Sequence, residues 1–392
     1  MNLFVKKLNN LINYIETFVI EKIIISQQNV TVPNTLLIIK VDAIGDYVLF
    51  RNFLQAVKES KTFLNYKITL CGNIAWKELA ESLDGKFVDK FVWLDRGHFY
   101  NSLTYRFRFL KRIYQAGYET ATYPTYSREI LYGDTIIKAS QSKKRIGSIG
   151  SMERHAKWKR SLFTNSVYTK KIKTSRENIF EFYRNKEFFE ELLGEKVKVS
   201  KPFIDTTGIL LPEEISGKLA KDRFIVLVPG AGISYRRWST DNFVKTANFI
   251  LDNYEYNIVI SGSEEEWAIA NEIMDKLHSI RVFNLAGCLK LSQLARLLSE
   301  AALLISNETS AVHFAAAVDT PVICISNGSF KGRFHPYPDE VFSEAYYVYP
   351  PQIESALGSG DTEEKYRYIS DIDVNSIKPA RVIEKIREIL KK

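Results

Sequence analysis

The sequence of 392 residues contains little cysteine, no internal repeat and no low-complexity tail. Its three cysteines are odd in number and lie far apart, without the spacing of metal ligands (Cys71, Cys288 and Cys324). This usage argues against a zinc site and against a disulfide framework, and it is typical of reduced core residues in a cytosolic protein. The lack of a repeat argues against a solenoid.

A long apolar run is also missing, even from the apolar N-terminal segment 1–34. Charged residues interrupt every apolar stretch there well short of the roughly 20 residues that cross a bilayer. The segment has neither the continuous apolar core nor the cleavage site of a signal peptide. Its apolar residues follow helical spacing instead (Leu8, Leu11, Ile12, Ile15, Phe18 and Val19). We expect an amphipathic helix that either packs on its own domain or rests on a membrane or a partner.

The remaining composition is that of a globular protein with ample material for a core, since 45% of the residues are hydrophobic and 26% are charged. A chain of 392 residues is long for one domain, so two domains are expected. The net charge of +8 is unevenly distributed. Residues 143–173 contain ten Lys or Arg residues and one acid, Glu153.

Strand-like apolar runs alternate with helical patterns along most of the chain, as in parallel sheets built from strand–helix–strand units. The predicted strands are 35–41, 67–72, 87–94, 119–123, 224–229, 257–261, 281–285, 301–306 and 321–326. The predicted helices are 47–59, 74–83, 100–116, 177–193, 240–253, 264–277, 291–299 and 309–317. We therefore expect an α/β fold with two doubly wound, Rossmann-like domains.

The boundary between the two domains is expected where Pro202, Gly208 and Pro212 interrupt the pattern. The first domain is then 35–200, after the helical segment 1–34, and the second is 201–375. A terminal amphipathic helix follows at 376–392. Because ligands of such sheets bind beyond the carboxyl ends of the strands, the loops after the strands are the places to look for a site.

Acidic residues follow two of the predicted strands. Asp46 comes after Gly45, near the start of a helix, and it is either an N-cap or a carboxylate placed to take a proton. Glu264 and Glu266 follow the strand at 257–261. They either complement the dipole of the next helix or accept hydrogen bonds from ribose hydroxyls.

The loop after the strand at 224–229 combines glycine with arginine. Gly230 and Gly232 allow backbone amides to approach a ligand closely, and Arg236 and Arg237 follow. Guanidinium groups suit phosphate because they form two parallel hydrogen bonds. The alternative is a polar surface loop with solvated arginines.

The loop after the strand at 301–306 opens a helix of small residues, and a helix N-terminus favours anions. Glu308, Thr309 and Ser310 lie at that N-terminus, and His313 follows one turn later. A single histidine on such a face is more often a hydrogen-bonded core residue than a catalyst.

Three segments together resemble glycosyltransferase family 9, the lipopolysaccharide heptosyltransferase family. They are "LLIIKVDAIGDYVLF", "VLVPGAGISYRRWSTDNFVKTANFI" and "LISNETSAVHFAAAVDTPVICISNG", in this order. The resemblance implies a GT-B fold, in which two Rossmann-like domains face each other across a cleft. It further implies that the C-terminal helix crosses back to the N-terminal domain.

The resemblance also implies roles for the residues. Asp46 is in the position of the general base of an inverting sugar transfer, and Arg236 is in the phosphate-facing position, with Trp238 beside it. Thr309 and Ser310 would hold the diphosphate, with His313 nearby. The family uses a nucleotide-diphosphate sugar, here expected to be ADP-linked, and requires no metal or other cofactor.

Two departures from the family pattern affect the expected donor pocket. Glu308, Thr309 and Ser310 stand where the family usually has Asp-Thr-Gly, and Arg236 stands where it has Lys. The longer Glu308 side chain and the Ser310 side chain change the shape of the phosphate and sugar pocket. Transfer from a nucleotide sugar is therefore better supported than heptose as the sugar.

The basic segment 143–173 is either a solvated charged face or the docking surface for an anionic glycolipid or oligosaccharide acceptor. Its candidate acceptor-facing residues are Lys143, Lys144, Arg145, Arg154, Lys157, Lys159 and Arg160. Such an acceptor places the enzyme in the cytoplasm, with peripheral association at the cytoplasmic face of the inner membrane. No nucleic-acid-binding motif accompanies the charge.

Two other functions remain open from the sequence. A nucleotide-dependent oxidoreductase would need a Gly-x-Gly-x-x-Gly turn after a first strand, and neither half of the chain has one. A non-catalytic relative could bind a nucleotide sugar or glycan without turnover, and the presence of Asp46 argues against it.

Overall fold

The computed structural model describes residues 3–151, 165–175, 178–219, 223–357 and 370–391, and the chain forms two units. The first unit comprises Met1–Glu177 and Tyr183–Val199, and the second comprises Asn178–Phe182 and Ser200–Lys392. The main boundary between the units lies between residues 199 and 200, one residue before the boundary expected between 200 and 201. The short segment Asn178–Phe182, expected in the first domain, belongs to the second unit because Glu181 forms a buried ion pair with Arg333.

The first unit contains a six-stranded sheet in the order β3-β2-β1-β4-β5-β6, and all its neighbours pair in parallel. Its strands are β1 (Val32–Lys40), β2 (Lys67–Asn73), β3 (Lys90–Leu94), β4 (Tyr118–Tyr123), β5 (Lys144–Ser148) and β6 (Lys170–Ile172). The central strand β1 is buried on both faces from Thr35 to Lys40, which explains its unbroken apolar run.

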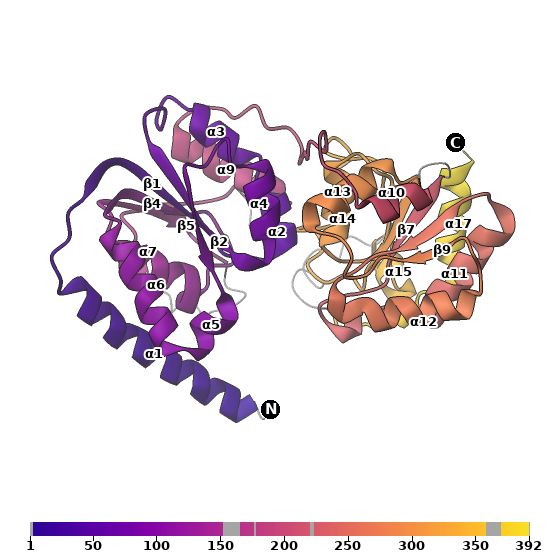
Figure 1. The fold of residues 1–392 in the computed structure, drawn as a ribbon. Coiled ribbons are helices and arrows are strands. Elements are labelled where there is room, and N and C mark those ends of the chain that lie inside the picture. Colours follow the sequence, from indigo (N-terminus) through magenta and orange to yellow (C-terminus); the bar gives the residue numbers. More distant parts are fainter. Residues whose placement is uncertain (1–2, 152–164, 176–177, 220–222, 358–369, 392) are drawn as a thin grey trace. The chain divides into compact units, whose positions relative to one another are not determined.

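Helices cover both faces of this sheet (Figure 1). One layer contains α1 (Leu3–Ile25), α5 (Arg96–Asn101), α6 (Leu103–Gln115) and α7 (Thr135–Ser140). The other contains α2 (Ile44–Val48), α3 (Phe53–Glu59), α4 (Lys77–Leu83) and α9 (Glu181–Leu193). Phe50 and Phe53 both contact Phe189, so the aromatic face of α9 closes this second layer.

The second unit repeats the arrangement, with a parallel sheet in the order β12-β11-β10-β7-β8-β9. Its strands are β7 (Phe224–Val228), β8 (Asn257–Ile260), β9 (Val282–Asn284), β10 (Leu303–Asn307), β11 (Val322–Ile325) and β12 (Ala345–Val348). Its helices are α10 (Glu213–Leu219), α11 (Thr240–Asn253), α12 (Trp267–Leu277), α13 (Leu291–Glu300), α14 (Ser310–Ala317), α15 (Pro351–Leu357) and α17 (Pro379–Leu390). The two doubly wound, Rossmann-like domains expected from the sequence are confirmed.

Three strands were not predicted: β5, β6 and β12. Each lies toward an edge of its sheet, where one side of the strand meets solvent or a short neighbour. The residues of β5 and β6 are mixed in polarity (KRIGS and KKI), whereas β12 is a short run of four residues (AYYV) whose first three are half-buried. An apolar-run criterion therefore does not detect β5 or β6.

The C-terminal helix α17 packs within the second unit, which differs from the expectation of a helix that crosses back to the first. It contacts α11, β11 and β12, and its apolar stripe is buried in the core of the second unit (Val382, Ile386 and Ile389). The Arg387 guanidinium also lies over the Phe249 ring of α11. These contacts explain why α17 belongs to the second unit.

None of the helices in the described part of the chain is long and apolar enough to cross a membrane. The N-terminal helix α1 packs on its own unit, where Ile20 and Ile24 join the core formed with α6 and α7. Contact of α1 with a membrane or a partner would use the face that points away from α6 and α7.

Candidate functional site

The predicted site residues of the second unit follow β7, β8 and β10, at the carboxyl ends of adjacent strands. Strands β7 and β10 are neighbours, and the chain leaves them toward opposite edges of the sheet. Such a switch point leaves a crevice outside the strand ends, where α/β sheets bind their ligands. The equivalent point in the first unit lies between β1 and β4.

Asn307, the last residue of β10, holds the loops after β7 and β10 together. Its side-chain amide donates to the carbonyl of Pro229 at 2.7 Å, and its side-chain oxygen accepts from the backbone N–H of Trp238 at 3.1 Å. Trp238 is buried, and its indole N–H donates to the carbonyl of Ile377 at 2.9 Å. Asn307 and Trp238 thus fix both ends of the loop that follows β7. The backbone that carries Arg236 is therefore held in place.

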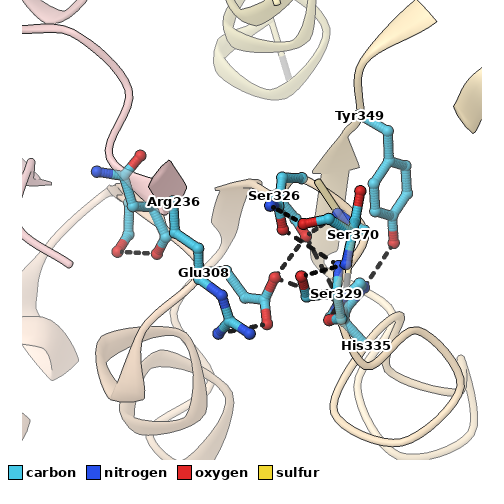
Figure 2. Close-up of polar contacts among 11 residues, drawn as sticks. Arg236, Glu308, Ser326, Ser329, His335, Tyr349 and Ser370 are labelled. Atoms are coloured by element: carbon cyan, nitrogen blue, oxygen red, sulfur yellow. Dashed lines mark hydrogen bonds and ion pairs between the residues drawn. The ribbon is translucent and has the colours of Figure 1, made fainter. Parts of the chain in front are cut away.

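Arg236 and Glu308 point toward each other at the ends of β7 and β10 (Figure 2). The distance between Arg236 Nη1 and Glu308 Oε1 is 3.5 Å, and the two side chains are 16% and 12% exposed. The other carboxylate oxygen, Oε2, accepts from the Ser326 hydroxyl at 2.6 Å and lies 3.4 Å from His335 Nε2. Burial acts to raise the pKa of Glu308, but His335, Arg236 and the Ser326 hydroxyl outweigh it and lower the pKa. Glu308 is therefore an ionised, nearly buried carboxylate.

His335 supports this carboxylate from the loop that follows β11 (Figure 2). Its Nε2 lies 2.7 Å from the carbonyl of Ser329, and its Nδ1 lies 2.9 Å from the Tyr349 hydroxyl. A carbonyl can only accept, so Nε2 carries a proton there. The sequence analysis did not identify His335, because its loop has no periodic pattern. Ser326 is the last residue of the predicted strand 321–326 and directly follows the observed end of β11, so attention to the strand end would have found it.

The buried Nε atoms of Arg236 and Arg237 have no hydrogen-bond partner among the described residues. The two arginines nevertheless differ in role. Arg237 donates from Nη2 to the carbonyl of Ala231 at 3.0 Å, which closes its own loop. Arg236 faces Glu308 and the Phe330 ring, 5.3 Å from the ring centroid. Arg236 is thus the better placed of the two to meet an anion.

Helix α14 begins at the same point. Thr309 is its N-cap, and the Thr309 hydroxyl accepts from the backbone N–H of Ala311 at 3.3 Å. Ser310 is the first helical residue. The structure therefore brings Glu308, Thr309 and Ser310 together with Arg236, as the sequence predicts.

His313 lies within α14 and is 8% exposed. Its Nδ1 lies 2.8 Å from the Tyr337 hydroxyl. Burial lowers the pKa of His313 to about 4, and the nearby Glu308 offsets only part of that effect. His313 is therefore a neutral, hydrogen-bonded residue of the core.

The two acids after β8 have different surroundings. The Glu266 side chain lies against Gly230, where an added Cβ would collide with its carboxylate. The Glu266 carboxylate also accepts from the backbone N–H of Ser263 at 2.8 Å, as part of a capping box. Glu264 is exposed in the same turn. Gly232 faces open space. Of these two glycines, therefore, only Gly230 must lack a side chain to leave room for Glu266.

In the first unit, Asp46 lies in the first turn of α2 and is half-buried. Its position is the third of the helix, and Ala43 occupies the N-cap position, so Asp46 is not the N-cap. Tyr47 anchors α2 from the opposite side, where its hydroxyl and the Arg51 guanidinium both contact the buried Asp84.

A second acid, Asp42, ties the loops after β1 and β4 together. Its carboxylate lies 2.9 Å from Lys40 Nζ and accepts from the Thr125 hydroxyl. Burial acts to raise the pKa of Asp42, but Lys40, Thr125 and Arg96 outweigh it and lower the pKa. Asp42 therefore stabilises the loop that carries Asp46.

The basic segment is only partly described. Lys143 and Lys144 are exposed. Arg145 donates to the carbonyls of Val167 at 2.6 Å and Ser142 at 2.5 Å, so it connects β5 to the next segment and is not a freely exposed cation. Arg154, Lys157, Lys159 and Arg160 lie outside the described residues. Across the described ranges, no group of three or more His, Cys, Asp or Glu side chains is arranged to hold a metal ion.

Comparison with known proteins identifies a family. The model of glycosyltransferase family 9 (heptosyltransferase) matches residues 141–346, which is more than half of the chain. Lipopolysaccharide heptosyltransferase 3 of Escherichia coli (strain K12) is 26% identical over 129 residues, which are 33% of this chain and 38% of that protein. The aligned segment thus spans less than half the length of this curated relative.

Solved structures show the same fold over nearly the whole chain. A family 9 glycosyl transferase from Veillonella parvula DSM 2008 is 15% identical with a TM-score of 0.67, and the match covers 92% of this chain and 97% of that one. The E. coli heptosyltransferase WaaC, solved with ADP-2-deoxy-2-fluoro heptose, is 14% identical with a TM-score of 0.63, covering 90% and 99%. The chain belongs to glycosyltransferase family 9.

Proposed function

We propose that this protein transfers a sugar, heptose or a close relative, from an ADP-linked donor to a lipopolysaccharide or related surface glycan. The observation that carries the proposal is the arrangement of Arg236, Glu308 and the N-terminus of α14 at the switch point between β7 and β10. This arrangement suits a diphosphate, and it occurs in a chain of glycosyltransferase family 9. The E. coli relative solved with an ADP-heptose analogue supports adenine as the base.

The donor diphosphate is assigned to the second unit. Arg236 would pair with the phosphate oxygens through its guanidinium, and the first backbone N–H groups of α14, after Thr309, would donate to them. As the glycosidic bond breaks, the leaving ADP gains negative charge, and these pre-placed donors would stabilise it. Gly230 and Gly232 would let the chain approach the donor, and Glu264 would accept from ribose hydroxyls.

The acceptor and the general base are assigned to the first unit. An acceptor hydroxyl must lose its proton as it attacks the sugar carbon, and the Asp46 carboxylate would take that proton. A single displacement at that carbon inverts its configuration. In this scheme the charge on the leaving group is met by Arg236 and α14, and no metal ion or other cofactor is required.

An anionic, lipid-linked acceptor would bring the enzyme to the cytoplasmic face of the inner membrane. The exposed Lys143 and Lys144 would contribute to binding of the acceptor. Arg145 is excluded from that role, because its guanidinium already bonds two backbone carbonyls.

The two departures from the family pattern meet at one contact, the Arg236–Glu308 pair. A guanidinium in place of a lysine allows two parallel hydrogen bonds to a phosphate, and the longer glutamate reaches the arginine from the next strand end. The contact between them supports retention of an anion site, and we expect an altered sugar pocket beside it.

A thermal-shift series with ADP, GDP, UDP, CDP and TDP tests the proposal, because a ligand that binds the native state raises the melting temperature. A selective shift with ADP is expected. A selective shift with another nucleotide would retain sugar transfer and reject an ADP-linked donor. No shift with any nucleotide would contradict the diphosphate site itself.

A further inference from the structure

Helix α1 turns most of its described large apolar side chains away from the protein, although Ile20 and Ile24 are buried. Six large apolar residues on it are each 44% to 58% exposed, and they recur at intervals that place them on one side of the helix. We call this side the outer face of α1. It comprises Leu11, Ile12, Ile15, Phe18, Val19 and Ile23.

The polar residues of α1 face the protein instead. Asn13, Thr17 and Glu21 are all buried. Arg106 of α6 donates to the carbonyl of Asn13 at 3.3 Å and to the hydroxyl of Thr17 at 3.2 Å, and Lys138 of α7 lies 2.5 Å from the Glu21 carboxylate. Polar contacts thus contribute strongly to the docking of α1, and the outer face takes no part in it. Ile20 and Ile24 add apolar contacts, but the six residues of the outer face stay exposed, whereas an ordinary surface helix buries its main apolar stripe.

The helical layer that carries the outer face is strongly basic. Together α1, α6 and α7 carry eight basic residues and two acids. Both acids are paired within the layer, Glu16 with Arg106 and Glu21 with Lys138. The ammonium groups of Lys22 and Lys138 lie 5.5 Å and 5.4 Å from the Phe18 ring centroid, at the edge of the outer face. The eight basic residues are Lys6, Lys7, Lys22, Arg106, Arg108, Lys111, Arg112 and Lys138.

We propose that the outer face of α1 binds the surface of an anionic lipid bilayer, with the helix lying in the plane of the headgroups. Apolar side chains next to Lys and Arg suit that interface. The apolar side chains enter the boundary of the acyl chains, and the Lys and Arg side chains meet the anionic headgroups. A second copy of the chain fits less well, because a symmetric contact would bring two basic layers together. The inference deepens the proposed function, since it rests on an acceptor that is held in such a bilayer.

Vesicle flotation of the full chain tests this surface without using nucleotide or acceptor. The wild-type protein is expected to float with vesicles that contain phosphatidylglycerol, less with pure phosphatidylcholine, and less as salt rises. The variant Ile15→Gln/Val19→Gln removes two exposed apolar side chains one turn apart. Its affinity for the anionic vesicles should fall about tenfold or more.

The matched control is Leu210→Gln/Ile280→Gln, which removes two apolar side chains that are 80% and 95% exposed in the second unit. It should float like the wild type. A wild-type melting temperature and ADP-induced shift in the α1 variant would show that it is folded, so loss of flotation can be assigned to the outer face.

The proposal is overturned if the wild-type protein does not float, or if the α1 variant floats as well as the control. Light scattering identifies the main competitor: a wild-type dimer that the α1 variant converts to a monomer, with no flotation of either, would make the outer face a contact between copies. Flotation of a protein that binds no nucleotide would keep the lipid surface and reject the proposed transferase.

Discussion

At the scale of single residues, Arg236 and Arg237 are neighbours in sequence but make different contacts. Arg237 bonds the carbonyl of Ala231 and so stabilises its loop. Arg236 faces Glu308 at a longer distance, 3.5 Å, and its Nε has no partner among the described residues. Sequence alone could not separate the two, because the difference depends on which direction the backbone turns after Ser234.

Replacing Arg236 with alanine should weaken the binding of ADP. A hydrogen bond to a charged group contributes about 1.5–3 kcal/mol, so the dissociation constant should rise roughly ten- to a hundredfold. Isothermal titration with ADP measures it. Arg296→Ala is the matched control, since that arginine lies on α13 and pairs with Glu300. Equal affinity of the Arg236→Ala and control proteins would contradict the phosphate role of Arg236.

His313 should make the stability of the second unit depend on pH. Its pKa is lowered to about 4 in the folded chain, so between about pH 6.5 and 4 the unfolded state binds a proton that the folded state does not. Stability therefore falls as the pH is lowered through this window, by about 1.5 kcal/mol between pH 6.5 and 5 from this group alone.

Urea unfolding at a series of pH values measures this contribution. The variant His313→Gln should lose about that much of the pH dependence. His278→Asn, at an exposed position after α12, should keep it. If the free energy of unfolding changes with pH equally in the two variants between pH 6.5 and 5, His313 is not held neutral by burial.

At the scale of elements, the buried central strands were predictable, and so were the edge strands β3 and β9, but β5, β6 and β12 were not. Residues 36–39 of β1, all of β7 and residues 303–305 of β10 are buried and read as unbroken apolar runs. Strand β5 begins with two basic residues and lies inside the most basic part of the sequence, so its pattern resembles a loop. The sequence located the ends of the central strands, and through them Asp46, Arg236 and Glu308.

The contacts of those residues could not be predicted in the same way. Glu308 meets His335 because the chain after β11 turns back toward β10, and no periodic pattern encodes that path. The terminal helix is a second example. Its amphipathic pattern predicts a helix at 376–392, but it does not say which unit buries the apolar stripe.

The packing of α17 leads to a prediction about the stability of the second unit. Ile386 is fully buried in the core of this unit. Ile386→Ala should lower the free energy of unfolding by about 2–5 kcal/mol through lost burial and the cavity that remains. Urea unfolding measures this cost. The control is Lys385→Ala on the same helix, whose ammonium pairs with Glu388 at the surface. A cost no larger than that of the control would mean that α17 is not part of this core.

At the scale of the whole molecule, the two units share one strand order and place their candidate residues at equivalent points. Asp46 follows β1 in the first unit, and Arg236 follows β7 in the second. Each of these strands is the first of its unit and lies beside the strand where the chain reverses direction across the sheet. This repetition places the proposed base and the proposed donor site at equivalent points of the two units.

The most direct test of the account is sugar transfer by the Asp46→Asn protein, measured as release of ADP from ADP-heptose with a lipopolysaccharide acceptor. Loss of a general base should lower turnover about 10²- to 10⁴-fold, while the affinity for ADP stays at the wild-type value. Asp252→Asn, at an exposed position of α11, should be fully active. Wild-type turnover by the Asp46→Asn protein would contradict the central claim that this carboxylate takes the acceptor proton.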